Sequence, residues 1–218
     1  CLVGSEMCIR DSHGGGSTSG VCFDETADYD GLTIHEINDA LYNFTEANPD
    51  FHLDLIGFDA CLMATYEAAA HMQYYADFMV ASEELEPSLG WNYAWLNALG
   101  ENPALDAQGI GVAIADAYME ACLDENPDDY LSMSVLYLPA MDYLVSTMET
   151  YASYLSQALD AGQLSTFSRA RQRMYAFGDF DSATSDMVDM MALIDGTRTI
   201  APQTADVLQT AYERVVRY

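Results

Sequence analysis

Helical and strand-like patterns of apolar residues alternate along the first two thirds of the chain. Thr33 and Glu36 form a capping box, which predicts a helix through about Ala47. The mostly apolar run 53–58 predicts a buried strand that leads directly into Asp59-Ala60-Cys61. The chain therefore places a cysteine just after a predicted strand.

The alternation continues beyond Cys61. Good helix formers at 62–72 predict a second helix, and Phe78–Ser82 predict a second strand. After a loop at 83–93, two helical stretches at about 93–99 and 107–124 and a further strand at 132–138 follow. Strands that alternate with helices favour a largely parallel sheet covered by helices, in which ligands bind beyond the carboxyl ends of the strands. Cys61 lies at such an end.

Beyond Pro139 the pattern changes to amphipathic helices with little strand signal. These helices are predicted at about 141–160, 164–177, 185–194 and 204–216. We therefore expect an α/β domain that ends at residue 138 and a helical subdomain over 139–218.

The charge balance restricts the classes of partner. The 218 residues include 35 acidic and 7 basic ones, all seven arginine, and the formal net charge is −28. Such a surface repels phosphate backbones, which argues against nucleic-acid binding, and it attracts cationic peptides. No apolar stretch is long enough for a transmembrane segment, and the first residues do not form a signal peptide. Five widely spaced cysteines without a C-x-x-C pair argue against a disulfide scaffold or a structural zinc site.

Cys61 and His13 are candidates for nucleophilic catalysis. A cysteine between a buried strand and a helix is held rigidly, and the positive end of the helix dipole favours its thiolate. His13 lies in a glycine-rich loop 48 residues upstream, where a base could reach a thiol across neighbouring strand ends. Alone, Cys61 is more simply a small core residue and His13 part of a surface loop. Together they follow the caspase spacing of a histidine about 50 residues before an Ala-Cys pair.

Four segments extend this pattern. They are Ser12-His13-Gly14-Gly15-Gly16, Gly20-Val21-Cys22-Phe23-Asp24-Glu25, the run from Asp54 to Ala64 around Asp59-Ala60-Cys61, and Ala81-Ser82-Glu83-Glu84-Leu85-Glu86-Pro87. With these motifs the chain resembles the clostripain family of cysteine peptidases, strongly from His13 to about Tyr93 and more loosely beyond.

The resemblance implies a caspase-like αβα sandwich with a mostly parallel sheet, and cleavage after arginine or lysine through a thioester. By position, Cys61 would be the nucleophile and His13 its base. The N–H groups of Gly14 and Cys61 would form the oxyanion hole. Asp59 would pair with the basic side chain of the substrate.

Ser82 and Glu83 should border the pocket of Asp59. The alternative for Glu83, Glu84 and Glu86 is a solvated loop or a cation site. No metal or cofactor is expected: calcium dependence occurs in part of the family, but no EF-hand loop is present. Secretion or a place on a bacterial cell surface is likewise only implied by the family.

The chain departs from the family in three places. The loop Pro87-Ser88-Leu89-Gly90 has an apolar residue where an acidic one would complete the pocket. No arginine or lysine lies between His13 and Cys61, so self-processing at a basic residue there is excluded. Residues 1–12 make a poor strand, and we expect them to be foreign to the natural protein. The catalytic domain at 13–138 is then partial, without its first strands, and the helical subdomain at 139–218 is expected to be truncated.

Two other functions stay open. One is an inactive relative of the peptidases that binds basic peptides in an acidic cleft. The other is a helical adhesion or scaffold module on a surface, for which the dyad is incidental. Convergence of the His13 and Cys61 side chains would separate the peptidase from both.

Overall fold

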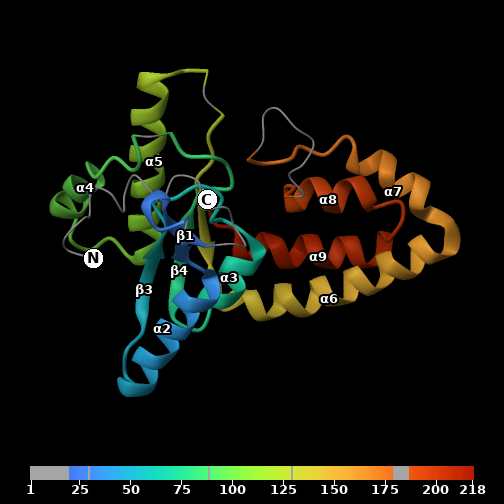
Figure 1. Cartoon of the computed structure of the whole chain (residues 1–218), viewed down its shortest axis with the longest axis horizontal. Coiled ribbons are helices and arrows are strands. Elements are labelled where there is room, and N and C mark those ends of the chain that lie inside the picture. The colour runs from blue at the N-terminus through green and yellow to red at the C-terminus, as the bar shows by residue number, and fades with distance from the viewer. Residues whose placement is uncertain (1–19, 29, 88, 129, 179–186) are drawn as a thin grey trace. The chain divides into compact units, whose positions relative to one another are not determined.

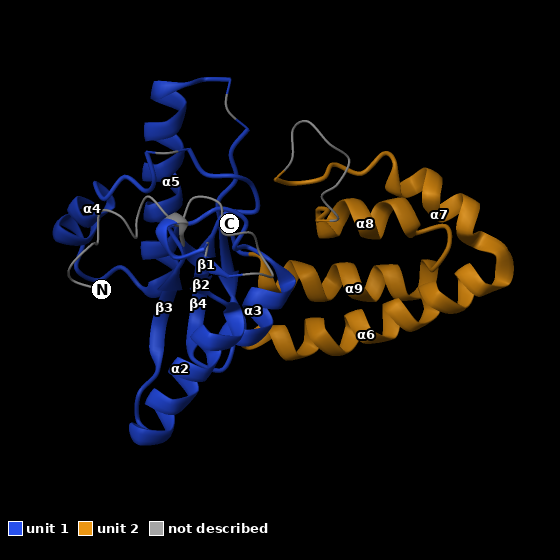
Figure 2. Cartoon of the chain, in the orientation of Figure 1, with its two compact units in different colours: residues 1–138, 217–218 blue, residues 139–216 orange. Residues whose placement is uncertain are grey.

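The structure is a computed structural model that describes residues 20–28, 30–87, 89–128, 130–178 and 187–218. These residues fall into two compact units (Figure 2). The first unit runs to Leu138 and includes Arg217 and Tyr218, and the second is Pro139–Val216. Each unit buries its own set of apolar side chains.

The first unit is built on a three-stranded sheet in the order β3-β4-β5 (Figure 1). β3 (Leu53–Gly57) and β4 (Ala76–Ala81) run parallel, and α3 (Tyr66–Met72) supplies the crossover that a parallel pair needs. β5 (Ser134–Tyr137) pairs with β4 in the antiparallel sense. The described sheet is therefore mixed in orientation, with one parallel and one antiparallel pair.

β4 is covered on both faces. Met79 and Val80 are adjacent residues of β4 and point to opposite faces of the sheet, yet both are fully buried. On the Val80 side lies α5 (Ala107–Glu125). It approaches closely because Gly111 has no side chain, and a Cβ there would stand only 2.9 Å from a methyl group of Val135. β3, by contrast, is only partly buried and forms an edge of the described sheet, so the prediction that it is a mostly buried strand is wrong.

Local signals set the helix before this sheet. α2 (Ile34–Ala47) begins at a complete capping box: the Glu36 N–H donates to Thr33 Oγ1 at 3.2 Å, and the Thr33 N–H donates to Glu36 Oε2 at 2.9 Å. The predicted start and end of this helix are confirmed. A short antiparallel pair, β1 (Val21–Asp24) and β2 (Asp30–Leu32), precedes it.

The remaining segments of the first unit frame the sheet. A loop of residues 82–94, of which the structure describes all but Ser88, joins β4 to α4 (Trp95–Glu101). We call it the β4–α4 loop. At the end of the chain, the Arg217 N–H donates to the Val135 carbonyl at 2.8 Å, so residues 217 and 218 run beside β5.

The second unit is helical in its described residues. Its helices are α6 (Met141–Ala158), α7 (Leu164–Arg171), α8 (Met190–Thr197) and α9 (Pro202–Val215). A wide turn at Leu159–Gln163 joins α6 to α7, and α6 packs along α9 (Figure 1). Between α6 and α8, the buried hydroxyls of Tyr151 and Thr197 are hydrogen-bonded to each other.

Candidate active site

Cys61 follows β3 in a segment that runs beside the β4–α4 loop. The Leu62 N–H donates to the Glu84 carbonyl at 3.2 Å, and the Ala64 N–H donates to the Ser82 carbonyl at 2.8 Å. Leu62 has a φ of 59°, a backbone conformation that is rare for a branched side chain. These bonds hold residues 61–65 out of a helix, and Thr65 caps α3 with its side chain.

The prediction that a helix starts at Leu62 is therefore wrong by four residues. Cys61 does not lie at a helix N-terminus, and the proposed help from a helix dipole does not apply to it.

The sulfur of Cys61 contacts a backbone N–H of the β4–α4 loop instead of a helix N-terminus. The Glu86 N–H donates to Cys61 Sγ at 3.1 Å, and the thiol faces the Glu86 carbonyl oxygen at 3.8 Å. Cys61 is only 2% exposed. A thiol can satisfy both contacts, since it accepts from the N–H and donates to the carbonyl, whereas a thiolate can only accept. The geometry around Sγ therefore suits the protonated cysteine.

Asp59 ties the same loop to the end of β3. Its Oδ1 accepts the Trp91 N–H at 3.0 Å, and its Oδ2 accepts the Tyr93 hydroxyl at 3.1 Å. Gly90 makes this approach possible, because its φ is +66° and a Cβ there would lie 3.1 Å from Asp59 Oδ1. Trp91 packs over Gly57, where a Cβ would stand 2.7 Å from the indole ring. The carboxylate of Asp59 is thus held in a defined orientation.

Glu86 places a second carboxyl group beside Asp59. It is 6% exposed, and its Oε1 accepts from Trp91 Nε1 at 3.4 Å. Within the described residues its Oε2 is buried and has no hydrogen-bond partner. Burial first, and then the charge of Asp59, raise the pKa of Glu86 to about 8. This carboxyl group is consequently protonated at neutral pH.

Two tyrosines line the same region. Tyr118 of α5 is fully buried, and its hydroxyl also lacks a hydrogen-bond partner among the residues that the structure describes. Burial and then Glu86 raise the pKa of Tyr118, and burial and then Asp59 raise that of Tyr93. The region therefore combines buried groups, Glu86 and Tyr118, with the half-exposed Tyr93 and the partly buried Asp59.

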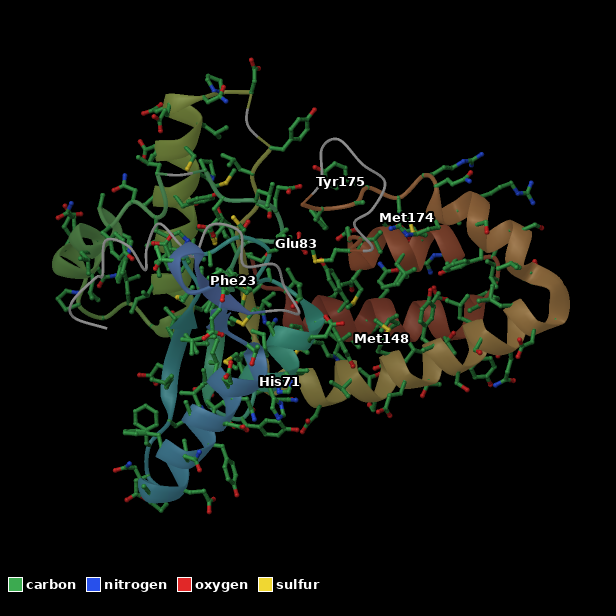
Figure 3. All side chains as sticks on the ribbon, in the orientation of Figure 1. Phe23, His71, Glu83, Met148, Met174 and Tyr175 are labelled. Atoms are coloured by element: carbon green, nitrogen blue, oxygen red, sulfur yellow. The ribbon has the colours of Figure 1, made fainter. Side chains whose placement is uncertain are left out.

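Ser82 and Glu83 lie at the start of the β4–α4 loop. The Ser82 hydroxyl is fully buried and donates to the Glu84 carbonyl at 2.9 Å. The Glu83 N–H donates to the Ser132 hydroxyl at 2.9 Å, and its side chain is partly exposed (Figure 3). Their predicted place at the border of the substrate pocket stays a prediction.

Glu84, at 2% exposure, is buried like Glu86, so the alternative of a solvated loop is wrong for these two residues. Along the described part of the chain, no three His, Cys, Asp or Glu side chains are grouped so that they could hold a metal ion.

His13 and Gly14 lie outside the described residues, so the predicted convergence of His13 with Cys61 stays a prediction. Of the other histidines, His35 and His52 are exposed and His71 is partly buried. His35 of α2 and His71 of α3 (Figure 3) have ring centroids 6.4 Å apart. His52 contacts Asp77 at 3.1 Å before β3, at the opposite end of that strand from Cys61.

Sequence reasoning missed Glu86, Trp91 and Tyr118 as parts of this region. Glu86 stands in the acidic run Glu83-Glu84-Leu85-Glu86, whose composition is typical of a solvated loop. Trp91 lies in the predicted loop at 83–93, and nothing in its sequence context indicates that its ring packs over Gly57. The apolar residues on either side of Glu86, Leu85 and Pro87, were the only signal for its burial.

Comparison with known proteins supports a single family. The model of the clostripain family of peptidases matches residues 5–218. A comparison with curated protein sequences gives no significant match. No helix in the described ranges is both long and apolar enough to cross a membrane.

Several solved structures share the fold. A secreted C11 cysteine protease from Bacteroides thetaiotaomicron, in complex with an irreversible peptide inhibitor, has a TM-score of 0.63 at 18% identity over 87% of this chain and 49% of its own. An inactive zymogen C11 protease from Parabacteroides distasonis has a TM-score of 0.59 at 17% identity, with 82% and 47% covered. A clostripain from B. thetaiotaomicron, in complex with the peptide inhibitor BTN-VLTK-AOMK, has a TM-score of 0.57 at 14% identity, with 89% and 77% covered.

The chain spans about half the length of the first two of these proteins. The likeness confirms the predicted α/β, caspase-like fold class. Taken with the match over nearly the whole sequence, it shows that the chain belongs to the clostripain family.

Proposed function

We propose that the chain is the nucleophile-bearing part of a cysteine endopeptidase that cleaves after arginine or lysine. The observation that supports this most is the position of Cys61 at the end of β3, two residues after an oriented Asp59, in a member of the clostripain family. A carboxylate held by two hydrogen bonds is a suitable partner for a guanidinium or ammonium group.

The proposed reaction uses His13 as the base. It takes the proton of the Cys61 thiol, and the sulfur attacks the carbonyl carbon of the scissile bond. The N–H groups of Gly14 and Cys61 stabilise the developing oxyanion, and His13 returns the proton to the leaving amine. Water then hydrolyses the thioester on Cys61, which releases the acid and restores the thiol.

The inhibitors of two relatives support a peptide substrate, and one of them supports a basic residue in it. One relative was solved with an irreversible peptide inhibitor and another with BTN-VLTK-AOMK, whose peptide part ends in lysine. The formal charge of −28 also favours encounter with cationic peptides. Ser82 and Glu83 complete the proposed pocket next to Asp59. We extend the secreted location of the first relative to this protein as part of the same proposal.

The test is turnover of fluorogenic peptides that end in Arg, Lys, Asp or Leu, in the longest natural polypeptide that contains this chain. We expect cleavage of the Arg and Lys peptides and a loss of at least about a thousandfold in Cys61→Ala. Asp59→Asn should reduce kcat/KM for the basic peptides more than for the Leu peptide. Turnover that survives Cys61→Ala would exclude the proposed nucleophile.

The proposed chemistry needs no metal or cofactor. We expect turnover after dialysis against a chelator to equal turnover with added calcium. A requirement for calcium would show that a cation site outside the described residues is part of the enzyme.

A second function is favoured by the burial of Cys61. A chain whose sulfur stays covered would bind basic peptides through Asp59 without hydrolysing them. Equal affinity of the unsubstituted protein and Cys61→Ala for an Arg peptide, with no product in either, would support this binder and exclude the peptidase.

A further inference from the structure

The described residues of the β4–α4 loop cover Cys61, and the contacts of its sulfur suit a thiol. The Glu86 backbone brackets the sulfur, with its N–H 3.1 Å and its carbonyl oxygen 3.8 Å from Sγ. Attack on a peptide bond requires a thiolate that a substrate can reach, and the closed loop provides neither. The loop must therefore move away from the sulfur before Cys61 can act.

The side chain of Glu86 anchors the loop in this position. Its Oε1 accepts the Trp91 indole N–H, and Trp91 packs over Gly57 and onto the cluster of Val80 and Ile114. The backbone that covers Cys61 and the carboxyl group in the protein interior belong to the same residue. Loss of the carboxyl group from the interior would therefore remove the side-chain contact that holds this backbone near Sγ.

The surroundings of the Glu86 carboxyl group stabilise its neutral form over its ionised form. The titratable groups that interact with it are Asp59 after β3, Tyr93 of the same loop and Tyr118 of α5, all acidic. Tyr118 in turn interacts with the acidic thiols of Cys61 and Cys122. Oε2 is buried without a hydrogen-bond partner in the described part of the protein. An ionised carboxylate there would face the charge of Asp59 and would have lost its water, so it would leave for the solvent.

We propose that Glu86 is a positioning residue that covers the nucleophile: the neutral carboxyl group holds the β4–α4 loop over Cys61, and its ionisation releases the loop and exposes the sulfur. The proposal rests on the proposed function for the role of Cys61 as nucleophile. It adds a proton-controlled cover to that site. The raised pKa of Glu86, about 8, places the release in the mildly alkaline range.

Alkylation of Cys61 by iodoacetamide tests the cover without any need for turnover. The full chain is labelled between pH 6 and pH 9.5, and the Cys61 peptide is quantified by mass spectrometry. Peptic digestion is used because no arginine or lysine lies between Arg10 and Arg169. Glu86→Gln keeps the size of the side chain and an acceptor for Trp91, and it cannot ionise.

We expect the unsubstituted protein and Glu86→Gln to react at equal rates at pH 6. At pH 9.5, where cysteine thiols are mostly ionised, the unsubstituted protein should react at least about tenfold faster. The quantity compared is the ratio of the two alkylation rates, unsubstituted protein over Glu86→Gln. Because His13 is present in both proteins, its titration cancels in this ratio. A ratio that stays flat or falls as the pH rises would overturn the proposal.

Two further variants separate positioning from general stability. Glu86→Ala removes the anchor and should react at least about tenfold faster than the unsubstituted protein already at pH 6. Glu84→Gln is the matched control, since Glu84 is as buried as Glu86 and its Oε1 accepts the Leu85 N–H instead of contacting Trp91. A pH dependence in Glu84→Gln equal to that of Glu86→Gln would also overturn the proposal.

The two proposals can fail separately. If the ratio of alkylation rates rises with pH but the protein cleaves no peptide, the peptidase proposal is excluded and the proposed role of Glu86 stands. Turnover that depends on Cys61 together with a flat ratio would exclude the cover alone. If Glu86→Ala does not fold, as judged by circular dichroism, the comparison with Glu86→Gln decides.

Discussion

The two units differ in how their buried polar groups are hydrogen-bonded. In the helical unit, the buried Tyr151 and Thr197 hydroxyls bond to each other, and Thr197 also donates to the Leu193 carbonyl at 2.6 Å. In the first unit, the Tyr118 hydroxyl and one oxygen of Glu86 are buried without a partner among the described residues. A buried polar group that lacks a hydrogen bond costs about 1–3 kcal/mol.

This difference separates a supporting region from a candidate site. In the described part of the helical unit, the buried hydroxyls of Thr147, Tyr151 and Thr197 all have hydrogen-bond partners. The cluster around Cys61 keeps groups that destabilise the fold, and such exceptions are expected where a protein performs its function. One single substitution and two pairs of substitutions sharpen or break this comparison.

The largest effect is expected from the ionisation of Glu86. Its pKa is raised from 4.5 to about 8, so the folded protein holds a proton that the unfolded chain has lost. The stabilisation is complete below pH 4.5 and declines by about 1.4 kcal/mol per pH unit until the pH passes 8. Glu86→Gln has no such proton. Between pH 5 and pH 8, the unsubstituted protein should therefore lose on the order of 3 kcal/mol more than the variant.

Urea unfolding followed by tryptophan fluorescence measures this difference, because Trp91 and Trp95 both belong to the first unit. Parallel pH dependences in the two proteins would show that Glu86 is already ionised in the folded state.

A smaller effect is expected from two glycines with positive φ. Gly90 has a φ of +66° and faces Asp59, whereas Gly162 of the helical unit has a φ of +98° and no atom within 4 Å of a built Cβ. Gly162→Ala should cost about 1 kcal/mol through the backbone alone. Gly90→Ala should cost about 2 kcal/mol, because the new methyl group also crowds the carboxylate of Asp59.

Urea unfolding followed by tryptophan fluorescence measures the stability of Gly90→Ala, and unfolding followed by far-ultraviolet circular dichroism measures that of Gly162→Ala. Equal costs would mean that the β4–α4 loop is not pressed against Asp59.

The smallest effect is expected from two tyrosine hydroxyls. Tyr151→Phe removes the partner of the buried Thr197 hydroxyl and should cost about 1 kcal/mol. Tyr118→Phe removes a hydroxyl that has no partner in the described residues, so it should leave the stability unchanged or raise it slightly. Urea unfolding of both variants tests the contrast directly. A loss in Tyr118→Phe as large as that in Tyr151→Phe would remove the distinction between the two units.

Elements with local signals were predicted well. The capping box of Thr33 and Glu36 set the start of α2, since its bonds join residues three positions apart, and Asn48-Pro49 set its end. α5 was predicted to start at Ala107, where the Asp106 side chain accepts the Gly109 N–H at 2.8 Å. α3 was predicted to start too early because Leu62 and Ala64 donate to the distant β4–α4 loop, a competition that helix propensity does not contain.

The sequence by itself determined that a cysteine preceded by Asp59 follows a strand, because the apolar run and the motif are both continuous in the chain. It also determined the membership in the clostripain family. Only the tertiary structure decided that Glu86, 25 residues further on, is buried beside Asp59 with its backbone on the sulfur of Cys61. The reason is physical: a carboxyl group titrates and packs according to the charges and water around it, and those neighbours come from β3, α5 and the loop itself.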